Sequence, residues 1–230
     1  MALLLSILFF FSWEVQANWK EKIIQDARDL YQPIAYAHFQ KPIEFKILDS
    51  PIIAGSAEHQ ATQLAVVLNT GLLDSPRLSP DALRMVVCHE LGHLFGGKPR
   101  KNIPMEWDGP IDEDGFSFMS AEGQADYYAS YVCFRELVKF QEGEEIGSVD
   151  WKRVGPLLFQ KCNADNLCLR TAIGGLDFLN LVRDFPISCE THDLKVATVL
   201  IRDSYPERQC RLDTLIEGAR FGQRPKCWFP

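Results

Sequence analysis

The sequence lacks several features that would place it in a familiar class of protein. It contains no Cys-x-x-Cys pair, which argues against a zinc knuckle, and no internal repeat of the length found in solenoid proteins. Lys and Arg form no dense run, and the formal net charge is −7, so nucleic acid is not expected as a partner. Beyond residues 2–13, no stretch is long and apolar enough to predict an integral membrane segment.

The first residues of the sequence indicate the compartment in which the protein is expected. Residues 2–13 are uncharged and rich in Leu and Phe, but they are shorter than the roughly 20 apolar residues that span a bilayer. Val15 and Ala17 stand three residues and one residue before a possible cleavage point at Asn18, a pattern typical of signal peptides. The sequence therefore predicts a signal peptide over residues 1–17 and a secreted or periplasmic protein. The alternative is that this segment forms an amphipathic or buried N-terminal helix.

Seven cysteines are present, which fits an oxidising compartment where most of them pair. Cys88 lies among apolar residues, so we expect it to be the unpaired thiol, buried as a small hydrophobic side chain. The other six allow several pairings. Among these, Cys162 with Cys168 and Cys210 with Cys227 are candidates because they are close in sequence.

The pattern of apolar residues predicts a single α+β domain over residues 18–230 that is mainly helical. The hydrophobic fraction of 47% is enough to form a buried core. Ser79 is expected to cap a helix that starts at Pro80 and stops at Gly96, and Ser120 a later one. Strands are expected at 43–48 and 63–69 and a turn at 51–56. Helices are expected at 23–36, 80–95, 121–140, 157–182 with a break near 163–166, 191–202 and 211–219.

The most informative segment is the pentapeptide His89-Glu90-Leu91-Gly92-His93, which lies within the helix predicted from Ser79 onward. Residues four apart lie on one face of a helix, so both imidazoles can bind one Zn²⁺. Glu90, beside the first histidine, is then placed to act as a general base. The alternative is that His89 and His93 are two ordinary helix residues.

A catalytic zinc ion usually has three protein ligands, so the chain must supply a third. Glu122 is the best candidate, 29 residues after His93 and in the first turn of the next predicted helix. Asp126 lies four residues later on the same face, where it can accept a hydrogen bond from a ligating imidazole. Taken without the histidines, Glu122 and Asp126 would be read as part of a solvated helix face.

The two motifs together resemble those of a known group of enzymes. His-Glu-x-x-His at His89, followed by Glu-x-x-Ala-Asp at Glu122, looks like the motif pair of gluzincin metallopeptidases, and of the M48 family in particular. The resemblance implies a gluzincin-like core in which a small sheet packs on the active-site helix. It also implies that His89, His93 and Glu122 bind zinc, that Glu90 is the catalytic base and that Asp126 supports the site.

The resemblance further implies a strand that binds substrate. The segment that contains Leu64, Val66 and Leu68 occupies the place of the edge strand that pairs with extended substrate backbone in these enzymes. We therefore expect these three residues to bind the substrate.

One position departs from the family pattern, which has His-Pro and then Arg downstream of the glutamate ligand. Here the corresponding residues are Tyr205, Pro206 and Arg211, so tyrosine replaces the histidine. A tyrosine hydroxyl can donate a hydrogen bond to a developing oxyanion, which makes Tyr205 a candidate catalytic residue. A packing role is the alternative.

The acidic run Asp108, Asp112, Glu113 and Asp114 does not have the spacing of an EF-hand, and a solvated loop is expected there.

The function expected from the sequence is a zinc-dependent endopeptidase that hydrolyses peptide bonds in exported or misfolded proteins. One alternative is an exported, disulfide-stabilised zinc-binding or chaperone-like protein with little turnover, a reading that the replacement at Tyr205 keeps open. Another is a zinc enzyme that acts on a non-peptide amide, such as a cell-wall component.

Overall fold

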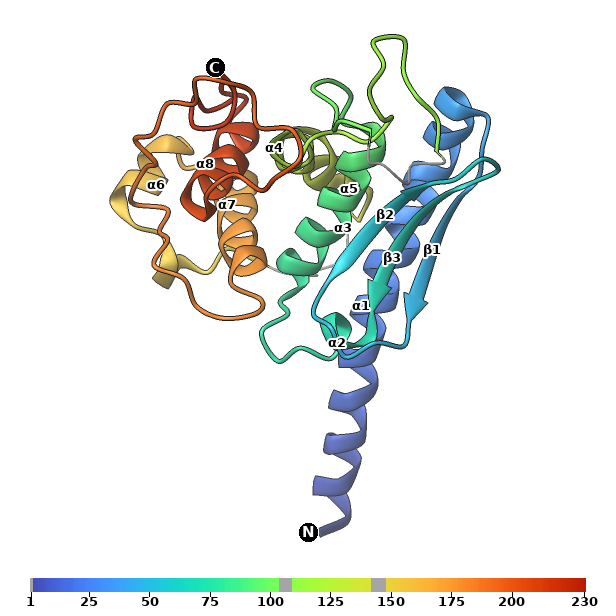
Figure 1. The fold of residues 1–230 in the computed structure, drawn as a ribbon. Coiled ribbons are helices and arrows are strands. Elements are labelled where there is room, and N and C mark those ends of the chain that lie inside the picture. The colour runs from blue at the N-terminus through green and yellow to red at the C-terminus, as the bar shows by residue number, and fades with distance from the viewer. Residues whose placement is uncertain (1, 104–108, 142–147) are drawn as a thin grey trace.

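The computed structural model describes residues 2–103, 109–141 and 148–230 and has a mixed fold of helices and one small sheet (Figure 1). This confirms the predicted combination of many helices with a small sheet, while the gluzincin core stays a prediction. The helices are α1 (Ala2–Phe39), α2 (Thr70–Leu73), α3 (Pro80–Phe95), α4 (Glu122–Tyr128), the π-helix η1 (Ala129–Cys133), α5 (Phe134–Phe140), the 3₁₀-helix η2 (Trp151–Arg153), α6 (Pro156–Lys161), α7 (Asn166–Leu179) and α8 (Arg208–Ala219).

The sheet consists of β1 (Ile43–Leu48), β2 (Gly55–His59) and β3 (Leu64–Asn69), in the order β1-β3-β2. β1 runs parallel to β3, and β2 runs antiparallel to it. The prediction that Leu64, Val66 and Leu68 lie on an edge strand for substrate is therefore wrong. Their strand is apolar on both faces and buried, which is typical of a central strand, and both of its edges are already paired.

The edge strand beside the helix with the histidine pair is β2, which the sequence analysis did not predict; the expected turn at 51–56 covers only its first two residues. Its sequence, Gly-Ser-Ala-Glu-His, is short and has little apolar alternation, so it gave no strand signal. Its first residue, Gly55, lies against α3. A Cβ atom at Gly55 would be 3.3 Å from Oε1 of Glu90. β2 therefore begins beside the predicted catalytic base.

Helix α1 extends past the predicted end at residue 36 and continues through Pro33 to Phe39. Ile23, Ala27, Tyr31 and Ala35 recur every four residues and are almost fully buried, in a helix that contacts α3 and β1. Tertiary packing of this face therefore outweighs the local cost of a proline inside the helix. In Figure 1 the N-terminal part of α1 extends away from the rest of the fold.

The part of the chain that the structure describes contains no helix with both the length and the hydropathy needed to cross a bilayer. The signal peptide over residues 1–17 stays a prediction.

Helices α6 and α7, with a break between them, confirm the prediction for residues 157–182, and α8 confirms the helix at residues 211–219. The prediction of a helix at residues 191–202 is wrong, because this segment forms neither helix nor strand. Leu194, Val196 and Val199 are exposed there, so the apolar residues that suggested a helix are not packed against the rest of the fold.

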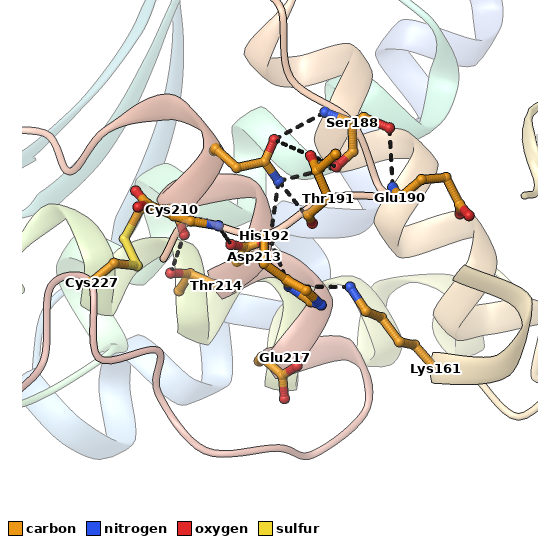
Figure 2. A network of polar contacts seen from close by, with 12 residues as sticks. Lys161, Ser188, Glu190, Thr191, His192, Cys210, Asp213, Thr214, Glu217 and Cys227 are labelled. Carbon is orange, nitrogen blue, oxygen red and sulfur yellow. Dashed lines mark hydrogen bonds and ion pairs between the residues drawn. A yellow bond between two sulfur atoms is a disulfide. The ribbon is translucent and has the colours of Figure 1, made fainter. Parts of the chain in front are cut away.

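The segment is instead held by polar contacts with α8 and the C-terminal residues, as Figure 2 shows for its first part. The backbone nitrogen of Asp193 donates to Asp213, and the Gln209 side chain donates to the Thr191 carbonyl. Farther on, the backbone nitrogen of Ala197 donates to the carbonyl of Lys226 in the C-terminal segment.

Disulfides join Cys162 to Cys168 and Cys210 to Cys227, as predicted. The prediction that Cys88 is unpaired is wrong: it is bonded to Cys133, and the free, buried cysteine is Cys189. Helices α3 and η1 pack side by side, a long-range contact that spacing in the sequence does not reveal. Burial raises the pKa of the Cys189 thiol to about 11, so this thiol is protonated at neutral pH.

Removal of the Cys88–Cys133 disulfide is expected to cost about 4 kcal/mol of the free energy of unfolding. The bond closes a loop of 45 residues, so it restricts the unfolded chain strongly. Urea unfolding of Cys88→Ala/Cys133→Ala measures this loss. The matched control is Cys162→Ala/Cys168→Ala, which opens a loop of 6 residues and should cost about 2 kcal/mol. A larger loss in the control would contradict the prediction.

Candidate metal centre

The histidine pair lies on α3, which begins and ends as the sequence predicts. The Ser79 side chain accepts a hydrogen bond from the backbone nitrogen of Ala82, Pro80 is the first helical residue, and the helix ends before Gly96. Helix α3 contacts the sheet, α1, α4 and α7, and nearly all its side chains are buried. The site is therefore built on a helix that the surrounding fold holds on several sides (Figure 1).

Helix α4 begins directly at Glu122, with Ala121 rather than Ser120 at the capping position. The predicted cap at Ser120 is wrong. Its hydroxyl donates to the carbonyl of Gly97, and its own carbonyl accepts from Nδ1 of His93. Ser120 thus connects the end of α3 to the start of α4 instead of capping a helix.

The structure brings His89, His93 and Glu122 together in a buried group that could hold a metal ion. Oε2 of Glu122 lies 3.2 Å from Nε2 of His89 and 3.5 Å from Nε2 of His93. This buried oxygen makes no hydrogen bond of good geometry. A metal ion between the three atoms would satisfy it, so the residues present fit the predicted cofactor.

The second nitrogen of each imidazole is held by a separate partner. Nδ1 of His89 lies 2.8 Å from Oδ1 of Asp126, and Nδ1 of His93 donates to the Ser120 carbonyl at 2.8 Å. Both contacts direct the Nε2 atoms toward Glu122, and they favour the tautomer in which Nε2 can bind a metal. Asp126 thus lies beside the first histidine, whereas the sequence analysis did not specify which of the two imidazoles it would contact.

Asp126 is fully buried and forms two hydrogen bonds with Arg211, at 2.7 and 2.8 Å. Burial alone would raise the pKa of Asp126, but the Arg211 guanidinium and His89 lower it below its usual value. Asp126 is therefore ionised when it holds His89. The sequence analysis noted Arg211 only as part of a family pattern, and its contact with Asp126 comes from the packing of α8 on α4.

The carboxylates around His89 and the imidazoles around Glu122 shift the pKa values of these two residues in opposite directions. Burial alone would lower the pKa of His89, but Asp126 and Glu122 outweigh this effect and raise it to about 9. Burial alone would raise the pKa of Glu122, but the close contacts with His89 and His93 outweigh this effect and hold it well below its usual range. A metal ion would have to displace the His89 proton.

Lys101 is a neighbour of the site that the sequence analysis missed. Its Nζ donates to Oε1 of Glu122 at 2.7 Å, which leaves Oε2 directed toward the two histidines. Lys101 lies outside the helices and strands, in the segment between α3 and α4, so no periodic pattern marked it.

A pocket of about 490 Å³ opens beside the site. Glu90 and His89 line it together with Tyr205, while Leu64, Val66 and Leu68 do not. The Tyr205 side chain is 62% exposed, and its ring lies 4.7 Å from the Arg211 guanidinium. Partial burial and the charge of Glu122 raise the pKa of Tyr205 to about 12, so its hydroxyl keeps its proton and can donate.

A second group, Asp193 with Cys210 and Cys227, also brings metal-binding residue types together. Cys210 and Cys227 are joined in a disulfide and offer no thiolate. This group is therefore a poor metal site.

Gly92 permits the close contact between the two ligand-bearing helices. A Cβ atom there would lie 2.5 Å from the carbonyl oxygen of Ala125 and 2.8 Å from its Cα, and these backbone atoms cannot move without α4. Gly92→Ala is therefore expected to cost about 2 kcal/mol of the free energy of unfolding and to weaken metal binding about tenfold. Urea unfolding and metal titration measure both effects.

The matched control is Gly175→Ala on α7. Its nearest contact would be Cδ1 of Leu215, at the flexible end of a side chain. Metal affinity should stay at the parental value in this control. Equal metal affinities of Gly92→Ala and the parent would contradict the role assigned to Gly92.

No protein-family model, curated protein or solved structure matches the chain.

Proposed function

We propose that the chain is a zinc-dependent endopeptidase of the M48-like gluzincin type, which hydrolyses peptide bonds in exported or misfolded proteins. The observation that carries this proposal is the buried group of His89, His93 and Glu122, with Asp126 behind the first histidine. This arrangement agrees with the roles that the motif pair implies.

Zinc is the metal we propose, because two imidazoles four residues apart on one helix, with a glutamate between them and a carboxylate as the third ligand, are typical of a catalytic zinc site. When bound, the ion would supply Lewis-acid chemistry that polarises a scissile carbonyl and makes water more acidic. His89, His93 and Glu122 would hold it. Asp126 and the Ser120 carbonyl would keep the two imidazole rings oriented.

Glu90 is proposed as the general base. It lies beside His89 on the same helix, lines the pocket and is not one of the three ligand residues. Its carboxylate would take a proton from the attacking water and pass it to the amine that leaves. Tyr205, in the same pocket, would donate a hydrogen bond to the oxyanion that develops.

The substrate is proposed to lie along β2. Within the described part of the chain β2 pairs only with β3, so its other edge can accept an extended peptide. Gly55 at the start of β2 lines the same pocket as Glu90, which would place such a peptide beside the base. This strand replaces Leu64, Val66 and Leu68 as the proposed substrate-binding element.

Export is part of the proposal. The three disulfides fit a protein that folds in an oxidising compartment.

Metal removal tests the proposed activity. We expect the zinc-loaded chain to cleave an unfolded protein, a chelator to stop cleavage, and added zinc to restore it. Mass spectrometry of the fragments measures this. A chain that binds both zinc and the unfolded protein without producing fragments would contradict the proposal and favour a chaperone-like binder. Release of small amines from cell-wall material alone would favour the amidase alternative.

A further inference from the structure

A second pocket, of about 220 Å³, lies apart from the residues that line the first. Four segments that are distant in sequence meet there, so the pocket exists only in the folded chain. Its walls carry four cationic side chains, two carboxylates and two aromatic rings: Lys98, Arg100, Arg202 and Arg224, Asp112 and Asp114, and Phe116 and Phe229. The acidic run that was expected to be a solvated loop thus contributes Asp112 and Asp114 to this pocket, while Asp108 lies outside the described residues.

Both carboxylates are already paired with cations. Asp114 accepts a hydrogen bond from Lys98, and Oδ2 of Asp112 lies 3.3 Å from Nε of Arg100. These pairs neutralise two of the four cationic side chains. Glu113, which does not line the pocket, also lies 3.4 Å from Nζ of Lys98. Arg202 and Arg224 are the other two cationic side chains of the pocket.

Neither of these arginines forms an ion pair among the described residues. Arg202 donates one hydrogen bond, from Nη1 to the carbonyl of Arg100 at 2.8 Å. Arg224 donates one, from Nε to the side chain of Gln124 at 2.7 Å. Each guanidinium has five N–H donors, so several donors on each remain for a ligand.

Aromatic rings hold the two guanidinium groups in place. The Arg202 guanidinium lies 4.2 Å from the ring centre of Phe116, and that of Arg224 lies 5.2 Å from the ring of Phe229 and 4.8 Å from that of Tyr127. Stacking leaves the edge of a guanidinium free to bind an anion, and it reduces the entropy lost on binding.

We propose that this pocket binds a dianionic oxyanion of the phosphate type, either free or as a monoester. Two unpaired guanidinium groups match the charge of about −2 that such a group carries near neutral pH, whereas a single carboxylate would neutralise only one of them. The proposal does not depend on the peptidase activity, because none of its residues is a metal ligand or lines the first pocket.

Calorimetric titration of the zinc-loaded chain with inorganic phosphate, at constant ionic strength, tests the proposal. Arg202→Met and Arg224→Met are each expected to weaken phosphate binding at least tenfold. Arg183→Met is the matched control, since Arg183 also stacks on a ring, that of Phe185, but lies outside the pocket. Its affinity for phosphate should equal that of the parent.

Further titrants identify the ligand. O-phosphoserine binding as well as phosphate does would assign the pocket to a monoester, and phosphate binding alone would assign it to the free ion. Acetate should bind at least tenfold more weakly than phosphate. Binding of acetate as tight as that of phosphate would overturn the proposal. Equal phosphate affinities of the parent, Arg202→Met and Arg224→Met would also overturn it, because the anion would then bind elsewhere, as at the zinc ion.

A second measurement needs no substitution, in case a variant does not fold. Phosphate should protect Arg202 and Arg224 of the parent chain from an arginine-modifying dicarbonyl reagent at least fivefold, as measured by peptide mass spectrometry. Arg183 should be modified at the same rate with and without phosphate. Equal modification of Arg202 and Arg224 in both conditions would overturn the proposal.

Discussion

Replacement of Glu90 by glutamine is expected to lower kcat/KM for peptide cleavage about 10³-fold and to leave metal affinity unchanged. Glutamine has nearly the same shape as glutamate but cannot accept and release the proton of the attacking water. Glu90 is not among the three residues whose ligand atoms converge, so the metal site should stay intact. Digestion of a peptide library by the parent and by Glu90→Gln measures both turnover and specificity.

Glu44→Gln is the matched control, because Glu44 lies on β1 away from the pocket. It should cleave at the parental rate. Equal turnover by Glu90→Gln and the parent would rule out Glu90 as the base. Loss of metal from Glu90→Gln would show that Glu90 acts on the metal site itself.

Replacement of Glu122 by alanine is expected to weaken zinc binding about 10³-fold, because it removes one of three protein ligands. The loss should exceed that of Gly92→Ala, which moves α4 but keeps every ligand. Competition with a chromophoric chelator measures the zinc affinity. Glu122→Ala also leaves Lys101 without its carboxylate partner. Glu122→Gln, which keeps the size of the side chain and can accept from Lys101, therefore separates loss of a ligand from loss of folding.

Glu136→Ala is the matched control. Glu136 lies on α5 and forms an exposed ion pair with Lys139. Its zinc affinity should not change. Parental zinc affinity in both Glu122 variants would remove Glu122 from the ligand set.

Local signals in the sequence predicted the elements on which the metal centre is built. Ser79 and Pro80 marked the start of α3, and the spacing of four residues placed His89 and His93 on one face. Glu122 was found because catalytic zinc needs a third ligand and the next helix offered a carboxylate. Each of these inferences uses residues within one helix or the coordination rules of the metal, so no knowledge of packing was needed.

Contacts between distant segments could not be predicted in the same way. The bond between Cys88 and Cys133 depends on α3 and η1 lying side by side, and the contact of Lys101 with Glu122 depends on an irregular segment. The strand at the edge of the sheet is β2 and not β3. The apolar sequence of β3 indicates that this strand is buried, but it does not indicate which strands lie on either side of it. Arg211 reaches Asp126 only through the packing of α8.

The central claim is that His89, His93 and Glu122 hold one zinc ion. Anomalous diffraction at the zinc absorption edge, from crystals of the zinc-loaded chain, tests it most directly. We predict one strong peak, bounded by Nε2 of His89, Nε2 of His93 and Oε2 of Glu122. A peak at another site, or the absence of a peak between these three atoms at saturating zinc, would contradict the account.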